Sequence, residues 1–271
     1  MNNSLNNTMS ENLNAILLDP AILLARQSLY RFAALTMLDP KADSWQRLRP
    51  LCDEPLLSDA SSIIRDLDEA DLQTLRLGEL RLTELVPSNV LRLLPETSSQ
   101  LNDQFENAFG LLVSKACPPH ETDYIDSKLS FQRSNTLADI SGFYRAFGLT
   151  TSKIHPERPD HIVQELEFMA FLIGLQRQAS ETNASGCREQ QEVCLDAQVR
   201  FLREHLAWWV PAFAKLLCHE AAGGFYEAAG KFLAALIAAE RALLSVTPAE
   251  RNALPTSPEV PEACEGCELA H

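Results

Sequence analysis

The 271-residue sequence has few glycines, few basic side chains and no long apolar run. Its 10 glycines are outnumbered by leucine and alanine, which lose little on entering a helix, whereas glycine loses much. Lys and Arg number 23 against 37 Asp and Glu, which gives a formal net charge of −14. Such a surface repels phosphate backbones, so we expect no nucleic-acid partner. It favours solubility or, as the alternative, attraction of a basic peptide.

The sequence also lacks the features of an exported or membrane-spanning chain. No apolar run approaches the ~20 residues of a transmembrane helix. The stretch Met1–Leu13 has neither Lys nor Arg, whereas a secretory signal begins with a positive region. The seven cysteines are odd in number and spread from Cys52 to Cys267, which is typical of reduced thiols. We therefore expect a cytoplasmic protein without membrane insertion.

Signatures of enzymes and of sheets are missing as well. The sequence contains no phosphate-cradling glycine loop, G-x-S-x-G elbow or H-E-x-x-H pair. Gly223-Gly224 is too short to hold a nucleotide and predicts a turn between two helices. No run of β-branched residues alternates with polar ones. The sequence therefore predicts an all-α protein with no catalytic residues, no cofactor and no resident metal.

Composition divides the chain into three parts. Residues 1–18 are polar and lack periodicity, which predicts a disordered leader. Asp19-Pro20 is a strong helix start, with Asp as the cap and Pro at the first helical position. Residues 19–246 are expected to form one helical domain of two lobes, with a polar hinge near 150–158. Residues 247–271 hold four prolines and five glutamates against one arginine, which predicts a flexible acidic tail.

Local signals also predict where several helices begin and end. Thr97 is a suitable N-cap for the helix that follows it. Gly148 is expected to close a helix that starts near Asn135. An amphipathic helix is expected over Pro159–Arg177, and a later one is expected to break at Pro211.

The start of that amphipathic helix is the most informative segment. Pro159 would occupy the first turn, and acidic side chains would lie near the positive end of the helix dipole. We expect the side chains of Asp160 and His161 to face outward beside the hinge. A surface histidine at a helix start is the simpler interpretation, because nothing gives His161 a catalytic partner.

Pro159–Met169, with the pattern P-D-H-I-x-x-E-L-E-F-M, resembles the signature of the TorD/DmsD/NarJ family of redox-enzyme maturation chaperones. Further blocks resemble that family in the expected order: Arg26–Ala33, Pro118–Tyr124, Ala138–Leu149 and His205–Pro211. Together the resemblance covers about residues 20–245.

The resemblance implies a TorD-like helical bundle that binds rather than catalyses. Its partner would be the immature catalytic subunit of a molybdopterin oxidoreductase of the dimethyl sulfoxide reductase class, bound through its signal peptide or N-terminal segment. The chaperone would support cofactor insertion before export or assembly. The residues implied for the peptide-binding surface are Pro159, Asp160, His161, Tyr30, Glu121 and Tyr124.

Two physical arguments accompany the resemblance. A twin-arginine signal has a basic end and an apolar segment, so its receptor needs carboxylates beside an apolar groove. Two hinged lobes would also permit a homodimer by domain swapping. The client remains open between an exported enzyme, such as selenate reductase or ethylbenzene dehydrogenase, and a nitrate reductase retained in the cytosol.

Cys264-Glu265-Gly266-Cys267 supports an alternative from another class. A C-x-x-C pair can bind zinc or cycle as a dithiol, which would make the chain a metal- or redox-active helical protein. A structural zinc site needs four ligands, however, and no second pair is present. Two unpaired thiols in the tail are the simpler interpretation.

Overall fold

The computed structural model describes residues 16–67, 74–110, 116–126, 130–150, 157–182 and 186–250. Its α-helices are α2 (Pro20–Met37), α3 (Ser44–Leu48), α4 (Leu56–Asp66), α5 (Pro87–Leu91), α6 (Ser98–Phe109), α7 (Ser130–Ala146), α8 (Ile162–Glu181), α9 (Cys187–Phe201), α10 (Ala207–Glu220) and α11 (Phe225–Leu243). Four 3-10 turns join them, namely η1 (Pro40–Ala42), η2 (Arg49–Asp53), η3 (Leu82–Glu84) and η4 (Glu121–Tyr124). In these residues the only β-pairing is the isolated bridge His120–His161, so the all-α prediction is confirmed.

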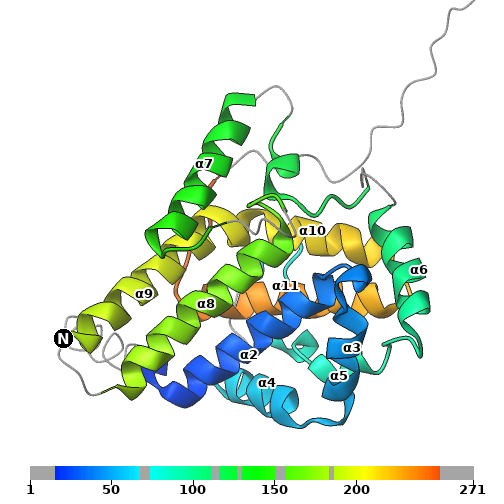
Figure 1. Ribbon diagram of the computed structural model, residues 1–271, viewed down its shortest axis with the longest axis horizontal. Helices are drawn as coiled ribbons and strands as arrows, with labels where there is room; N and C mark the ends of the chain where they lie inside the picture. Colours follow the sequence, from blue (N-terminus) through cyan, green and yellow to red (C-terminus); the bar gives the residue numbers. More distant parts are fainter. Residues whose placement is uncertain are drawn as a thin grey trace, which may run out of the picture.

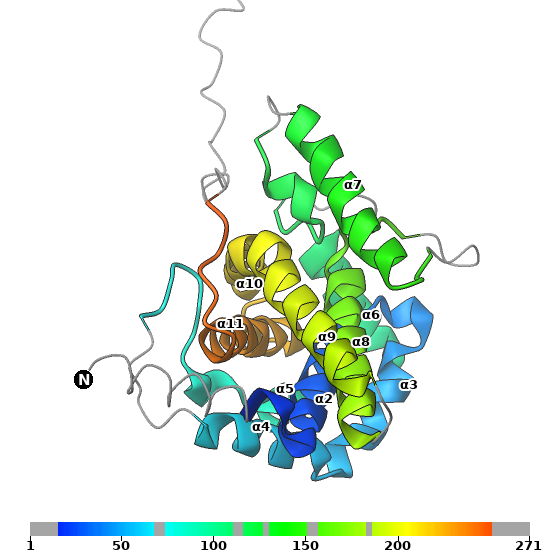
Figure 2. The same ribbon diagram turned by 90° about the vertical axis from the view of Figure 1, so that its left-hand side faces the viewer.

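Helix α2 lies at the centre of the bundle (Figure 1). It packs along α8 and also contacts α4 and α11, while α8 packs on α9 and α10 packs on α11. The π-helical turn η5 (Leu202–Leu206) joins α9 directly to α10, so these three elements form one long helical run. Helix α7 lies at the edge of the bundle, apart from the closely packed helices (Figure 2).

The predicted start of α2 is confirmed. The carboxylate of Asp19 accepts a hydrogen bond from the Ala21 N–H at 2.8 Å, and Pro20 occupies the first turn. Leu17 is already buried, and the side chain of Gln176 donates to its carbonyl oxygen at 3.0 Å. The leader expected over residues 1–18 therefore does not include Leu17, because this residue packs on the core; residues 1–15 lie outside the described part.

Thr97 and Gln100 form a complete capping box at the start of α6, as the Thr97 prediction requires. Gly148 follows α7 with a φ of +74°, a conformation that favours glycine. Both predictions depend on residues close in sequence, and both are confirmed.

Three predicted helix boundaries are wrong. Helix α7 is already formed at Ser130, whereas its start was predicted near Asn135. Helix α8 begins at Ile162 rather than Pro159, with His161 as its N-cap. Its first turn is displaced because Pro159 and Asp160 form a turn that pairs with η4. Pro211 lies inside α10 instead of breaking it. The carbonyl of Pro211 packs against Gly78, so tertiary contacts support the helix at this residue.

One hydrophobic cluster extends from Leu17 to Val246 and includes residues on both sides of the predicted hinge. Residues 151–156 of that hinge lie outside the described part, so the division into two lobes stays a prediction. At the other end, the Ala249 N–H donates to the Arg203 carbonyl at 3.0 Å. Residues 251–271, with most of the expected tail, also lie outside it. None of the described helices is long and apolar enough to cross a membrane.

Candidate functional site

The turn η4 and the start of α8 are joined through their backbones. The Glu121 N–H donates to the Asp160 carbonyl at 2.9 Å, and the Ile162 N–H donates to the Pro119 carbonyl at 2.8 Å. These bonds form the His120–His161 bridge. The structure therefore brings together two blocks that lie about 40 residues apart in the sequence. We call this region, with the side chains of α7 and η5 that touch it, the η4 junction.

Asp160 is fully buried in the η4 junction, so the expectation that its side chain faces outward is wrong. Its Oδ2 accepts hydrogen bonds from the backbone N–H and the hydroxyl of Thr122, at 3.1 and 2.8 Å. The guanidinium of Arg158 donates to both carboxylate oxygens, at 3.0 and 2.7 Å. The carboxylate faces inward because these donors satisfy it there. Asp160 thus holds η4 against the turn that precedes α8.

His161 is partly buried and caps α8, where its Nδ1 accepts a hydrogen bond from the Val163 N–H at 3.2 Å. Burial lowers the pKa of His161 to about 4, so the imidazole is neutral at pH 7 and can accept this bond. Its ring contacts the ring of His120 edge to face, 5.0 Å between centroids. His120 lies 3.6 Å from Asp123 and 3.5 Å from Glu157, which places two partly exposed carboxylates beside it.

Glu121 is fully buried and receives hydrogen bonds from two side chains of the α9–α10 run. The Nδ1 of His205 lies 2.9 Å from Glu121 Oε2, and the indole N–H of Trp208 donates to Oε1 at 2.6 Å. The other ring nitrogen of His205 lies 3.3 Å from Asp139 Oδ2 on α7. Burial lowers the pKa of His205, but hydrogen bonds to Asp139 and Glu121 outweigh it and leave the pKa above its ordinary value.

Glu165, one turn into α8, lies behind Glu121 and is also fully buried. Burial and the nearby charge of Glu121 raise its pKa well above its usual range, although the hydrogen bond that the indole of Trp209 donates at 3.1 Å acts in the opposite direction. Its environment therefore favours the protonated form of Glu165. Trp209 is fully buried and Trp208 only partly, as expected for two tryptophans at the end of an amphipathic helix.

The remaining sequence-predicted site residues lie in two different places. Tyr124 closes η4: its ring packs on Trp209 and its hydroxyl donates to the Pro118 carbonyl at 3.1 Å. Tyr30 does not join this group. It lies fully buried beside the ion pair of Arg26 and Glu240, which connects α2 to α11.

The geometry divides the predicted residues by accessibility. Pro159 and His161 are partly exposed, whereas Asp160, Glu121, Tyr124 and Tyr30 are buried. Sequence reasoning missed the accessible carboxylates of Asp123, Asp139 and Glu157, whose side chains are 34%, 49% and 44% exposed. It also missed the contact of His205 with Glu121, although both residues lie in blocks that resemble the family.

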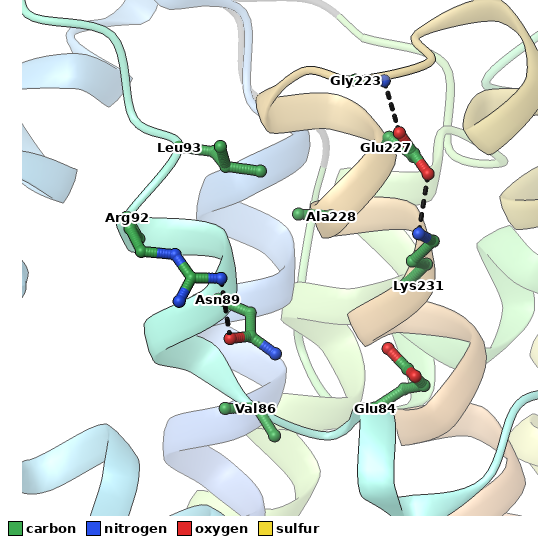
Figure 3. A pocket seen from close by; sticks show the side chains of 9 residues that line it. All are labelled: Glu84, Val86, Asn89, Arg92, Leu93, Gly223, Glu227, Ala228 and Lys231. Atoms are coloured by element: carbon green, nitrogen blue, oxygen red, sulfur yellow. Dashed lines mark hydrogen bonds and ion pairs between the residues drawn. The ribbon is translucent and has the colours of Figure 1, made fainter.

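A pocket of about 200 Å³ lies elsewhere, between η3, α5 and the start of α11 (Figure 3). The Glu227 carboxylate forms an ion pair with Lys231 Nζ at 2.7 Å and accepts a hydrogen bond from the Gly223 N–H. The Arg92 guanidinium donates a hydrogen bond to Asn89 Oδ1 at 3.3 Å. Glu227 and Lys231 are thus paired with each other within the wall of the pocket, and we assign no ligand to it.

The described cysteines are free thiols, and the described residues contain no cluster of His, Cys, Asp or Glu that could hold a metal ion. Cys264 and Cys267 lie outside the described part. The metal or redox alternative therefore stays a prediction.

The family described as "Nitrate reductase delta subunit" matches residues 76–215, just over half of the chain. The chain belongs to this family. The match contains the whole η4 junction, from Pro118 to Trp209, so the nitrate reductase delta subunit family includes the region singled out above. The resemblance to TorD- and NarJ-type proteins is thereby confirmed.

Individual relatives agree with this assignment. The chain is 35% identical over 112 residues to the selenate reductase assembly chaperone protein of Thauera selenatis, covering 41% of this chain and 54% of that protein. It is 34% identical over 116 residues to the chlorate reductase assembly chaperone protein of Ideonella dechloratans (43% and 56%). It is 27% identical over 145 residues to the chaperone protein TorD of Aliivibrio salmonicida (54% and 64%). The chain thus spans between about half and two thirds of these relatives' length.

Proposed function

We propose that this protein is a cytoplasmic chaperone for the catalytic subunit of a molybdenum-containing reductase. Its family and its relatives, which are named as reductase assembly chaperones and TorD, support this role. The chaperone binds the immature subunit before its cofactor is inserted and before export or assembly. It acts by binding, without a catalytic residue of its own.

The client contacts the η4 junction through its N-terminal segment, including a signal peptide where the subunit has one. The observation that carries this proposal is the group of three partly exposed carboxylates around η4: Asp123, Asp139 and Glu157. Asp139 and the partly buried ring of Phe143 both contact His205, and the partly buried Trp208 donates to Glu121 in the same junction. Carboxylates beside apolar rings fit a segment that carries arginines followed by apolar residues.

Buried Asp160 and Glu121 serve this surface indirectly. Asp160 holds η4 and Arg158 in place, and Glu121 fixes the indole of Trp208. Pro159 and His161 remain the predicted residues with accessible surface for peptide contact. Tyr30 is fully buried beside the ion pair of Arg26 and Glu240, so it has no surface for contact with a peptide and is not part of the site.

Titration calorimetry with synthetic N-terminal peptides of the molybdenum reductases of the same cell tests the proposal. We expect one peptide to bind, and the triple variant Asp123→Asn, Asp139→Asn, Glu157→Gln to weaken that binding at least tenfold at low salt. Because screening weakens exposed charge pairs, wild-type affinity should also fall as salt rises.

Asp103→Asn is the matched control, since it removes an exposed carboxylate from α6, outside the η4 junction. If the triple variant and this control bind equally well, the surface assignment is wrong. If no reductase peptide binds at 100-fold excess, the client proposal itself fails.

A further inference from the structure

A chain of titratable side chains crosses the η4 junction and ends on α7. It runs from Asp139 on α7 to His205 in η5, then to Glu121 in η4 and Glu165 in α8. The three residues after Asp139 are fully buried, and they come from three different elements. Their arrangement has consequences that do not depend on the proposed function.

His205 has a carboxylate at each ring nitrogen. Nδ1 lies 2.9 Å from Glu121 Oε2, and Nε2 lies 3.3 Å from Asp139 Oδ2. A neutral imidazole has a single N–H, so it can donate to only one of these two acceptors. Only the imidazolium carries an N–H on both nitrogens, and its Nε2 then meets Asp139 as a charged contact rather than as an aligned hydrogen bond. The contact with Glu121 is shorter and fully buried, so a neutral ring keeps that one and gives up Asp139.

The buried carboxyl groups of Glu121 and Glu165 also favour a state in which one of the two is protonated. Burial and the charge of Glu121 raise the pKa of Glu165, and Glu165 Oε1 receives no hydrogen bond from any described donor. A second charge on Glu165 is therefore disfavoured, and the proton is held preferentially on this carboxyl group. The proton on Glu165 leaves Glu121 as the charged partner of His205.

Helix α7 also contacts the bundle through aromatic rings, one hydroxyl and two arginines. Phe143, Tyr144 and Phe147 pack on Phe168 and Phe201, and the Tyr144 hydroxyl donates to the Pro159 carbonyl at 2.8 Å. The guanidinium of Arg133 donates to the Ile125 carbonyl, and Arg200 lies over the ring of Phe143. Asp139–His205 is an ion pair between α7 and η5, and its His205 partner is the one member of these contacts that can lose its charge near neutral pH.

We propose that Asp139, His205, Glu121 and Glu165 form a proton-dependent latch for α7: the helix is fastened while the His205 imidazolium bridges Asp139 and Glu121, and it loosens when the ring is neutral. The proton leaves from Nε2 to solvent, which reaches this edge through the half-exposed side chain of Asp139. The charged groups that face His205 are Asp139 and Glu121, with Glu165 and Asp160 behind Glu121. The π-turn η5 is the kind of local widening that is frequent at functional positions in helices.

Hydrogen–deuterium exchange of α7 tests the latch without any client. Protection of the α7 amides, corrected for the intrinsic effect of pH, should fall by up to about tenfold per pH unit between the ordinary histidine pKa of about 6.5 and the raised pKa of His205, and should level off above it. Protection of α2 and α11 should not change over that range. Asp139→Asn and His205→Gln should give low α7 protection with no such pH dependence, whereas Asp103→Asn, which alters an exposed carboxylate on α6, should behave like the wild type.

Nitrogen-15 NMR of the histidine rings supplies a second readout. The latch requires both ring nitrogens of His205 to be protonated at pH 7 and Nδ1 alone to be protonated when α7 loosens. A neutral ring at pH 7, or α7 protection that does not vary with pH, overturns the proposal. Equal pH profiles for Asp139→Asn and the wild type also overturn it.

Discussion

Replacement of Asp160 by Ala should destabilise the protein by about 3 kcal/mol. The buried Thr122 N–H and hydroxyl would lose their acceptor, at a cost of about 1–3 kcal/mol for unsatisfied buried groups. The bidentate pair with Arg158 would add about 1 kcal/mol, a low value because the Arg158 side chain is 44% exposed and screened by solvent. Asp160→Asn keeps a hydrogen-bonding side chain for Thr122 and should lose about 1 kcal/mol.

Urea unfolding followed by circular dichroism measures both variants. With a slope of about 2–3 kcal/mol per molar urea, Asp160→Ala should lower the midpoint by roughly 1 M. Asp103→Ala on α6 should leave it unchanged. Asp160→Ala within about 0.5 kcal/mol of the wild type would refute the buried role of this carboxylate. Asn and Ala variants of equal stability would show instead that the bonds to Thr122 contribute little.

Three further predictions concern stability. Arg26→Met should lower the free energy of unfolding, measured in urea, by about 3–5 kcal/mol because it leaves the buried Glu240 carboxylate unpaired. Adding Glu240→Leu should recover much of this loss. A double variant as unstable as Arg26→Met would contradict the ion-pair explanation. The lowered pKa of His161 means that the unfolded chain binds its proton first as pH falls from about 6.5 towards 4, so stability decreases in that window. His161→Asn keeps an N-cap and should flatten that part of the pH profile; an unchanged profile would exclude His161 as its cause. Gly78→Ala should lower the thermal unfolding midpoint by several degrees, because residue 78 has a φ of +87° and the alanine methyl group would meet the Pro211 carbonyl. An unchanged midpoint would refute the close contact between Gly78 and Pro211.

The sequence predicted those parts of the fold that depend on neighbours in the chain. Asp19-Pro20 and the Thr97–Gln100 box cap helices through residues two or three positions apart, so the signal and its partner lie within one short segment. The end of the helix before Pro211 was not predictable in this way. Its continuation depends on η5 upstream and on Gly78, which lies far away in the chain.

In the candidate site too, features that depend on neighbouring residues were predictable, whereas those that depend on distant residues were not. The blocks that resemble the TorD/DmsD/NarJ family pointed to Asp160 and Glu121, and the structure places both at one junction. Their inward orientation was not predictable, because Asp160 is satisfied by Thr122, 38 residues away, and Glu121 by His205, 84 residues away. The role of Asp139 could not be predicted, because exposed aspartates on helices are common and its contact with His205 is visible only in the structure.

The π-turn η5 sets the rotational phase of α10 relative to α9. Trp208 and Trp209 are adjacent in sequence, yet they donate to Glu121 in η4 and to Glu165 in α8, respectively. If Leu202–Leu206 wound as a regular α-helix with no residue removed, every later side chain of α10 would turn by about 100° about the helix axis. Both indoles would then leave their carboxylates at once. The wide turn therefore absorbs one extra residue, and it keeps both tryptophans on the face that meets η4 and α8.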